Sequence, residues 1–236
     1  MSNKIKKLTE IIIPTICNVC HQRTAKEPLC AKCTPKEYLD FTLLRCEICF
    51  NVLQRLDDNH ICQICEAKIQ IYNKKKFIFS YKGNVRDIIR TMKFRKSRNL
   101  CRYMASMAKE QISKLFDKTD WDFVIPIPSA KIVLRKRGYN QCDYLVQNIF
   151  DHINNNILYH KGYKNLQATL NYTQRKKNIK NRFYLKNQEV LADKKILIVD
   201  DILTTGATSD EVGQLIRNTN VQRLDFFALA KVELSQ

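Results

Sequence analysis

The sequence predicts an α/β protein in which a parallel sheet flanked by helices follows a small metal-binding module. Three observations lead to this fold class. Apolar strand-like segments alternate with helical patterns after residue 76, as in parallel sheets that are covered on both faces. Eight of the ten cysteines are clustered before that point. The chain has 236 residues, which is enough for one medium-sized domain with a small module attached.

The clustered cysteines form four C-x-x-C pairs. Two cysteines separated by two residues can bind one metal ion with both sulfurs, and two such pairs complete a tetrahedral zinc site. Two structural zinc ions are expected, because four thiolates leave no open coordination position. Sequential pairing is favoured because each short loop closes at low entropic cost, but the spacing also allows a cross-braced arrangement. The expected ligands are Cys17, Cys20, Cys30, Cys33, Cys46, Cys49, Cys62 and Cys65.

The first residues lack the features of a targeting sequence. Lysines are followed by only three isoleucines, so we expect neither a signal peptide nor a membrane span of about 20 apolar residues. A cytoplasmic location is therefore expected, and it disfavours disulfides. The segment Asn73–Lys76 is the expected boundary between a double zinc-ribbon module at 1–76 and a larger domain at 77–236. Cys101 and Cys142 are expected to be ordinary, partly buried cysteines of that domain.

The larger domain is expected to alternate strands and helices. Strands are expected at 76–81, 123–128, 195–200 and 224–230, and helices around 85–92 and at 99–118, 140–154 and 209–218. The segment 195–200 is almost continuously apolar, which is typical of a strand that is buried on both faces.

The most informative segment runs from 196 to 208. A buried strand is predicted to end in Asp200 and Asp201, outside the core, and a hydroxyl-rich loop then leads into a helix. Free backbone N–H groups, threonine hydroxyls and the helix dipole suit a phosphate monoester. Gly206 permits a close approach of the backbone to the ligand. The two carboxylates suit sugar hydroxyls and a hydrated Mg²⁺.

This segment resembles the signature with which type I phosphoribosyltransferases bind phosphoribosyl pyrophosphate (PRPP). Two further runs, Val124–Pro128 and Leu134–Gln141, resemble motifs of the ComF/ComFC family of competence-associated proteins. Shorter segments at 81–86, 92–95 and 167–178 also fit. That family combines a double zinc ribbon with a phosphoribosyltransferase domain, so the resemblance covers nearly the whole chain and implies a type I phosphoribosyltransferase-like sheet. Ser129–Lys131 departs from it, because many relatives resemble Leu-His-Pro there.

The resemblance implies a role for each part of the site. Asp200 and Asp201 would hold the ribose hydroxyls of PRPP, directly or through Mg²⁺. Five loop residues would surround the 5′-phosphate: Thr204, Thr205, Gly206, Ala207 and Thr208. Ser129 and Lys131 would lie near the pyrophosphate. A mobile basic hood would close over it, exclude water and neutralise the leaving group. The residues of this hood would be Arg135, Lys136 and Arg137.

Basic residues exceed acidic residues by a wide margin, 41 against 23, which gives a net charge of +18. Polyanionic partners fit this charge, although a solvated basic surface is the alternative. Two basic runs stand out, Lys82–Arg102 and Lys161–Lys186, and the second contains four aromatic residues. Basic grooves with exposed aromatic rings suit single-stranded DNA. The alternative is that the rings belong to the core and the charges to a solvated face.

Two functions are therefore predicted. The resemblance favours a late competence protein in DNA uptake and natural transformation, with a PRPP-binding domain and a surface for single-stranded DNA. Competence helicases and recombination-mediator proteins are candidate partners. The alternative is an active phosphoribosyltransferase of nucleotide metabolism, which would transfer ribose phosphate from PRPP to an unidentified acceptor. The sequence shows no obvious general base or nucleobase pocket, and it does not decide between the two.

Overall fold

The computed structural model describes residues 15–24, 26–53, 59–116, 121–150, 153–154, 156–162 and 182–233. The segment 163–181 lies outside the described residues, and most of the second basic run lies there with it. None of the described helices is long and apolar enough to cross a membrane.

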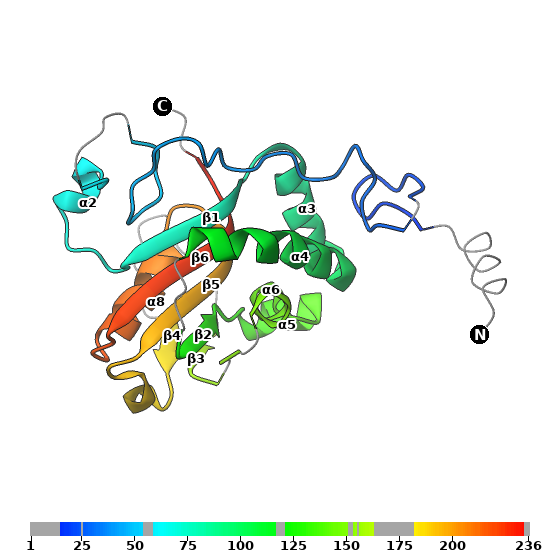
Figure 1. Ribbon diagram of the computed structural model, residues 1–236. Coiled ribbons are helices and arrows are strands. Elements are labelled where there is room, and N and C mark those ends of the chain that lie inside the picture. The colour runs from blue at the N-terminus through cyan, green and yellow to red at the C-terminus, as the bar shows by residue number, and fades with distance from the viewer. Residues whose placement is uncertain are drawn as a thin grey trace, which may run out of the picture.

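A four-stranded parallel sheet forms the centre of the molecule (Figure 1). Its strands lie in the order β1-β6-β5-β2 and comprise β1 (Lys74–Ser80), β6 (Arg223–Lys231), β5 (Lys195–Leu203) and β2 (Phe123–Pro126). The two central strands pair from Lys195 opposite Arg223 to Leu203 opposite Lys231. The apolar run at 196–199 is fully buried, as expected for a strand that is covered on both sides. The predicted α/β class with a parallel sheet is confirmed.

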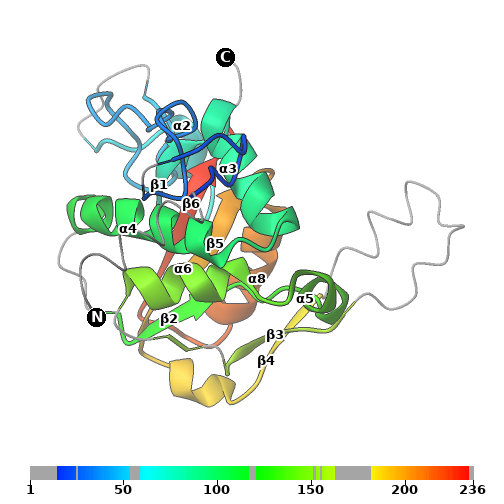
Figure 2. The same cartoon turned by 90° about the vertical axis from the view of Figure 1, so that its right-hand side faces the viewer.

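Helices cover both faces of this sheet (Figure 2). One face carries α3 (Gly83–Phe94), α4 (Arg98–Leu115) and α6 (Gln141–Ile149). The other carries α8 (Ala207–Arg217), the 3₁₀ helix η1 (Gln188–Leu191) and the antiparallel pair β3 (Leu158–His160) and β4 (Phe183–Leu185). Successive side chains of β5 alternate between the two cores, because the side chains of a strand point to opposite faces in turn.

Several elements differ from their predicted bounds. Helix α6 ends at Ile149, because Phe150 already has an extended backbone conformation. The residues expected to form the basic hood lie in the last turn of a short helix, α5 (Lys131–Arg137). It ends at Gly138, whose φ of 81° is left-handed and therefore favours glycine. Strand β5 continues through Asp200 and Asp201 to Leu203, three residues beyond its predicted end.

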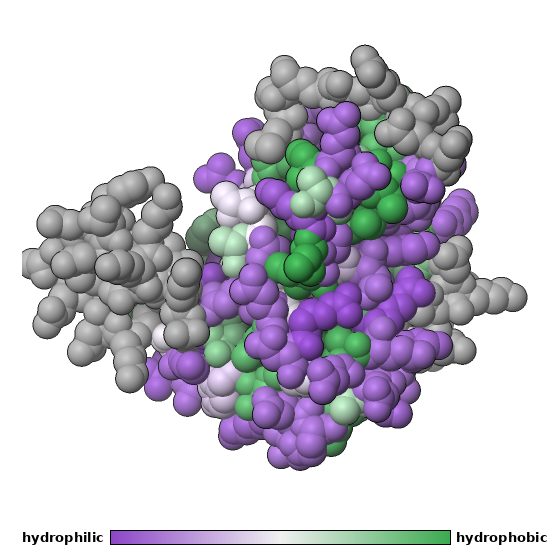
Figure 3. Space-filling view, turned by 90° about the vertical axis from the view of Figure 1, so that its left-hand side faces the viewer, coloured by the Kyte–Doolittle hydropathy of each residue, from purple (hydrophilic) through white to green (hydrophobic). Residues whose placement is uncertain are grey.

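The described part of the N-terminal segment packs directly against the larger domain. Apart from α2 (Gln63–Glu66), it is held by turns and isolated bridges. The Leu39 N–H donates to the Ile78 carbonyl at 2.8 Å, and the Lys75 N–H donates to the Ile48 carbonyl at 2.6 Å. Both cores therefore continue into this segment, and β1 begins within the stretch that was expected to be a boundary. Hydrophilic residues dominate the face seen in Figure 3, with apolar residues in small patches between them.

Candidate functional site: two cysteine groups and a cleft beside the phosphate loop

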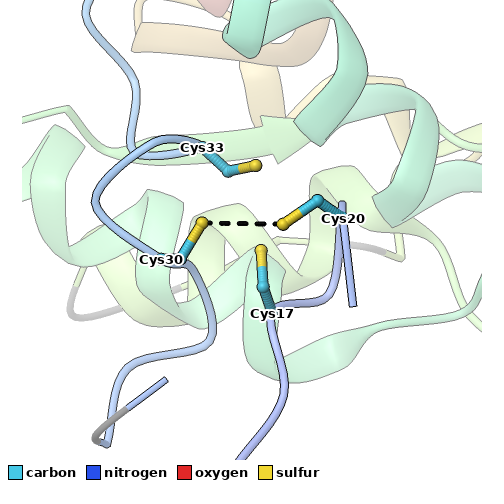
Figure 4. A group of neighbouring side chains, drawn as sticks. All are labelled: Cys17, Cys20, Cys30 and Cys33. Atoms are coloured by element: carbon cyan, nitrogen blue, oxygen red, sulfur yellow. Dashed lines mark hydrogen bonds between the residues drawn. The ribbon is translucent and has the colours of Figure 1, made fainter. Parts of the chain in front are cut away.

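The eight clustered cysteines form two groups of four. Within each group the sulfur atoms lie within 4.8 Å of one another, and the groups follow sequence order: Cys17, Cys20, Cys30 and Cys33 in the first, Cys46, Cys49, Cys62 and Cys65 in the second. Figure 4 shows the four sulfurs of the first group pointing toward a common centre. Each set has the tetrahedral four-sulfur composition that zinc prefers, so each group can hold one ion. Of the two arrangements that the spacing allows, the structure has the sequential one.

In the first cysteine group, backbone N–H groups favour the thiolate of Cys17, whereas burial and the neighbouring cysteines raise the pKa of Cys33. Burial alone works against ionisation of Cys17, but N–H groups of Cys20, Cys30 and Val19 outweigh it and lower its pKa to about 6. In the second group, the Cys62 N–H donates to the Cys46 sulfur at 3.4 Å. Zinc binds the thiolate and not the thiol, so N–H groups that donate to these sulfurs also favour zinc binding.

The predicted phosphate loop borders a cleft of about 320 Å³ at the carboxyl ends of β5 and β2. Six of the predicted site residues line this cleft: Asp200, Asp201, Thr204, Thr208, Ser129 and Arg137. Thr205 and Gly206 lie on the other side of the loop, where they line a second cavity, and Ala207 begins α8. Lys131, Arg135 and Lys136 are exposed on α5 and do not line the cleft.

The loop has the conformation of a helix start that can accept an anion. Gly206 precedes α8 with a left-handed φ of 83°, which a residue with a Cβ adopts only with strain. Its carbonyl accepts from the Asp210 N–H and the Ser209 hydroxyl, both at 2.8 Å. The first N–H groups of a helix have no partner within the helix, and the positive end of its dipole lies there. These features suit a phosphate group.

The acid pair lies within β5, before its end at Leu203, and lines the cleft. Neither carboxylate belongs to the two apolar cores; Asp200 is half-buried and Asp201 is buried. The Asp201 carboxylate contacts the Lys93 ammonium at 2.9 Å, and only 6% of Asp201 is exposed. Asp200 Oδ1 accepts from the Asp201 N–H at 2.8 Å and from the Cys142 thiol at 3.4 Å. Burial and the neighbouring Asp201 charge raise the pKa of Asp200 to about 7. The Lys93 ammonium offsets part of the desolvation cost of burying the Asp201 carboxylate.

Comparison with known proteins decides the family. The family model of the phosphoribosyl transferase domain matches residues 96–233. The chain belongs to this family. The cleft and the loop just described fall within the matched residues, apart from Lys93 on α3.

Curated relatives extend the similarity beyond the matched domain, and two of them cover 88% and 94% of this chain. Competence protein F of Haemophilus influenzae is 26% identical over 215 residues, which cover 88% of this chain and 92% of the relative. Competence protein ComFC of Streptococcus pneumoniae is 28% identical over 181 residues, which cover 72% of this chain and 74% of the relative. DNA utilization protein YhgH of Shigella flexneri is 22% identical over 230 residues, which cover 94% of this chain and 99% of the relative. The predicted resemblance to ComF/ComFC proteins is thereby confirmed.

The sequence analysis assigned no role in the site to four residues that line the cleft: Lys93, Cys142, His160 and Arg182. Lys93 was placed in a basic run and in the segment 92–95 that fits the resemblance, but no role in the site was assigned to it. Cys142 was taken as an ordinary core residue, yet its thiol contacts Asp200. The Arg182 guanidinium pairs with Glu211 at 3.2 Å and donates to the Thr208 hydroxyl at 3.2 Å, so it reaches the phosphate loop.

A second cavity, of about 430 Å³, lies on the other side of the phosphate loop. It is enclosed by Cys49 of the second cysteine group, by Thr205 and Gly206, and by the end of β6. Three cations and two acids line it: Arg45, Lys75, Lys231, Asp210 and Glu233. Lys75 pairs with Asp210 at 3.5 Å, and Arg45 pairs with Glu233 at 3.7 Å. The metal-binding module therefore forms one wall of a space that adjoins the phosphate loop.

Proposed function

We propose that the cleft binds PRPP together with Mg²⁺. The observation that carries this proposal is the convergence of an acid pair, a phosphate-binding helix start and a basic group in one cleft. The 5′-phosphate would lie at Thr204–Thr208, where N–H groups and hydroxyls are available. The ribose hydroxyls would face Asp200 and Asp201, and the pyrophosphate would face Ser129 and Arg137.

Each group of the chain would then hold one part of the ligand. Mg²⁺, when bound, would neutralise the pyrophosphate and link it to the carboxylates. The Arg137 guanidinium, which now donates to Gln141 at 3.2 Å, would supply fixed positive charge beside the leaving group. Lys131, Arg135 and Lys136 would reach the ligand only if α5 tilts toward the cleft, with Gly138 at its end as the pivot.

Calorimetry with Mg-PRPP tests this proposal. The double variant Asp200→Asn, Asp201→Asn keeps the shape of both side chains and removes both charges, so we expect PRPP binding to be lost while the fold persists. Asp193→Asn removes a carboxylate from an exposed site and is the matched control. If PRPP raises the melting temperature of the double variant as much as that of the wild type, the assignment of the acid pair is wrong.

We propose further that the protein acts in DNA uptake and binds single-stranded DNA. The net charge of +18 and relatives named for competence and DNA utilization support this role. Affinity should fall steeply with salt, with a logarithmic slope of about −0.7 per phosphate contact. Replacing Arg175, Lys176 and Lys177 with alanine, all outside the described residues, should flatten the slope by about two units and leave PRPP binding unchanged. An unchanged slope at unchanged affinity would contradict the assignment of this run.

The second candidate function is phosphoribosyl transfer, and the cavity beside the phosphate loop favours it. This cavity shares Thr204 with the cleft and offers room for an acceptor next to bound PRPP. The acceptor would form a bond to C1′ of the ribose as pyrophosphate departs. Release of pyrophosphate that depends on an added acceptor would support transfer. PRPP binding without release for any nucleobase tested would favour a binding role alone.

A further inference from the structure

Lys93 is the member of the first basic run that points into the cleft. It lies in the last turn of α3, whose residues Val85, Ile88 and Met92 are fully buried against the sheet. This packing fixes the helix, and the lysine side chain extends from its end to the carboxyl half of β5. Its ammonium reaches Asp201 at 2.9 Å, and only 22% of the side chain is exposed.

Three other cations of this run contact residues outside the cleft acid pair. The Arg86 guanidinium pairs with the neighbouring Asp87 at 3.5 Å. Arg95 donates to the Asn18 carbonyl and contacts His21. The Arg98 guanidinium lies over the rings of Tyr139 and Tyr144, at 5.8 and 5.6 Å from their centroids. A role in the general basic surface therefore explains Lys93 less well than a role in the cleft.

Lys93 lies beside the acid pair. Carboxylates and a diphosphate would come close together there, so the site needs positive charge at this point. The two other strongly basic residues that line the cleft stand elsewhere, Arg182 at the phosphate loop and Arg137 at Gln141. Lys93 alone of the three contacts the acid pair. A lysine ammonium has three N–H donors, and the contact with Asp201 uses one of them. Two donors thus remain for an anionic group of a bound ligand.

We propose that Lys93 is the resident cation of the PRPP site, which neutralises Asp201 in the free protein and donates to the diphosphate of the ligand when PRPP binds. This inference rests on the proposed function and deepens it. The Lys93 ammonium then supplies part of the positive charge that a divalent metal would otherwise provide at the site. Its consequence is that PRPP affinity depends more strongly on Mg²⁺ when Lys93 is removed than it does in the wild type.

The test is a titration of PRPP by calorimetry across Mg²⁺ concentrations from trace to saturating. Trace conditions are reached by passing the buffer over a chelating resin, because a soluble chelator would also strip the cysteine groups. Lys93→Met removes the charge, and Lys93→Gln removes it but keeps a hydrogen-bond donor for Asp201. Lys93→Arg keeps the charge. Lys82→Met, at an exposed lysine just before α3, is the matched control.

We expect Lys93→Met and Lys93→Gln to lose at least about 10-fold in PRPP affinity at trace Mg²⁺, with the loss shrinking toward saturating Mg²⁺. Lys93→Arg and Lys82→Met should bind as the wild type does. Melting curves identify folded variants, and Lys93→Gln decides the question if Lys93→Met does not fold. A loss of equal factor at every Mg²⁺ concentration, or no loss, overturns the role of Lys93 alone. A wild type that binds no PRPP overturns this inference together with the proposed function.

Discussion

Asp200 illustrates how the site is built at the cost of stability. The side chain is half-buried beside a second carboxylate, and desolvation and the neighbouring charge raise its pKa to about 7. The Lys93 ammonium is paired with Asp201 and only partly offsets this. A carboxylate whose pKa is raised in the folded state costs stability at neutral pH, and such groups cluster at functional sites.

The raised pKa of Asp200 predicts the direction in which stability changes with pH. In the unfolded chain an aspartate loses its proton near pH 4. Between about pH 4 and pH 7 the folded state therefore binds more protons than the unfolded state, and the free energy of unfolding falls as pH rises. Asp200→Asn removes this fall. We expect the free energy of unfolding of the variant to exceed that of the wild type by on the order of 2 kcal/mol at pH 8, and by less at pH 5.

Urea unfolding at the two pH values measures this effect. The cysteine groups also respond to pH, but they are the same in both proteins, so the difference between variant and wild type isolates Asp200. Asp193→Asn again serves as the control, because its carboxylate is exposed. If the free energies of unfolding of variant and wild type differ by the same amount at pH 5 and pH 8, Asp200 is already ionised in the folded protein at pH 5.

Helix α8 is held close to the segment before β1, and that contact positions the phosphate loop. Tyr72 is fully buried, and its hydroxyl donates to the Ser209 carbonyl at 2.5 Å, in the first turn of α8. Gly213 faces the same tyrosine one turn later. A Cβ at this position would lie 2.7 Å from Tyr72 Cζ and 2.8 Å from its hydroxyl oxygen, and it would also clash with Ile71. The close approach of helix and tyrosine therefore requires glycine.

Gly213→Ala should destabilise the protein, although alanine favours helices by about 1 kcal/mol over glycine. The added methyl group has no space, so we expect a net loss of about 1–3 kcal/mol in the free energy of unfolding. Gln214→Ala, at an exposed position of the same helix, should change it by less than about 0.5 kcal/mol. Urea unfolding of both variants is the measurement. Stabilisation by Gly213→Ala would mean that α8 stands further from Tyr72.

The sequence predicted the elements whose signal is local and missed those that depend on tertiary contacts. The apolar run before Asp200 and the glycine-containing loop after it indicated strand, turn and helix start correctly. The continuation of β5 to Leu203 was missed, because it depends on pairing with β6. The contact of Lys93 with Asp201 joins residues far apart in the chain, so no spacing rule could have revealed it. The basic hood was expected from the resemblance alone, and the sequence analysis did not predict that its residues form the last turn of helix α5.

At the scale of the whole molecule, the two cysteine groups contribute to one folded unit with the phosphoribosyltransferase domain. Cys17, Cys33 and Leu29 belong to the same core as α3 and α4, whereas Phe50 belongs to the core beneath α8. Phe50 also lies under the Lys76 ammonium, 4.7 Å from the ring centroid. Disorder in either cysteine group would therefore affect the packing on a different face of the sheet.

The pairing of the cysteines predicts a reciprocal pattern of zinc content. In the sequential arrangement, the double variant Cys17→Ser, Cys30→Ser damages one site and should retain one zinc ion per chain. The double variant Cys17→Ser, Cys46→Ser damages both sites and should retain none. A cross-braced arrangement of alternate pairs would give the opposite result, because Cys17 would then share a metal with Cys46 and not with Cys30.

Native mass spectrometry of the wild type and both double variants measures the zinc content directly. The wild type should hold two zinc ions, since each group of four sulfurs converges on one centre. Cys101→Ser, outside both groups, should also hold two and is the control for the substitution itself. Four thiolates bind zinc cooperatively with folding, so a site that lacks one ligand binds weakly and its segment loses order. One ion retained with Cys17 and Cys46 replaced, and none with Cys17 and Cys30 replaced, would contradict the sequential arrangement.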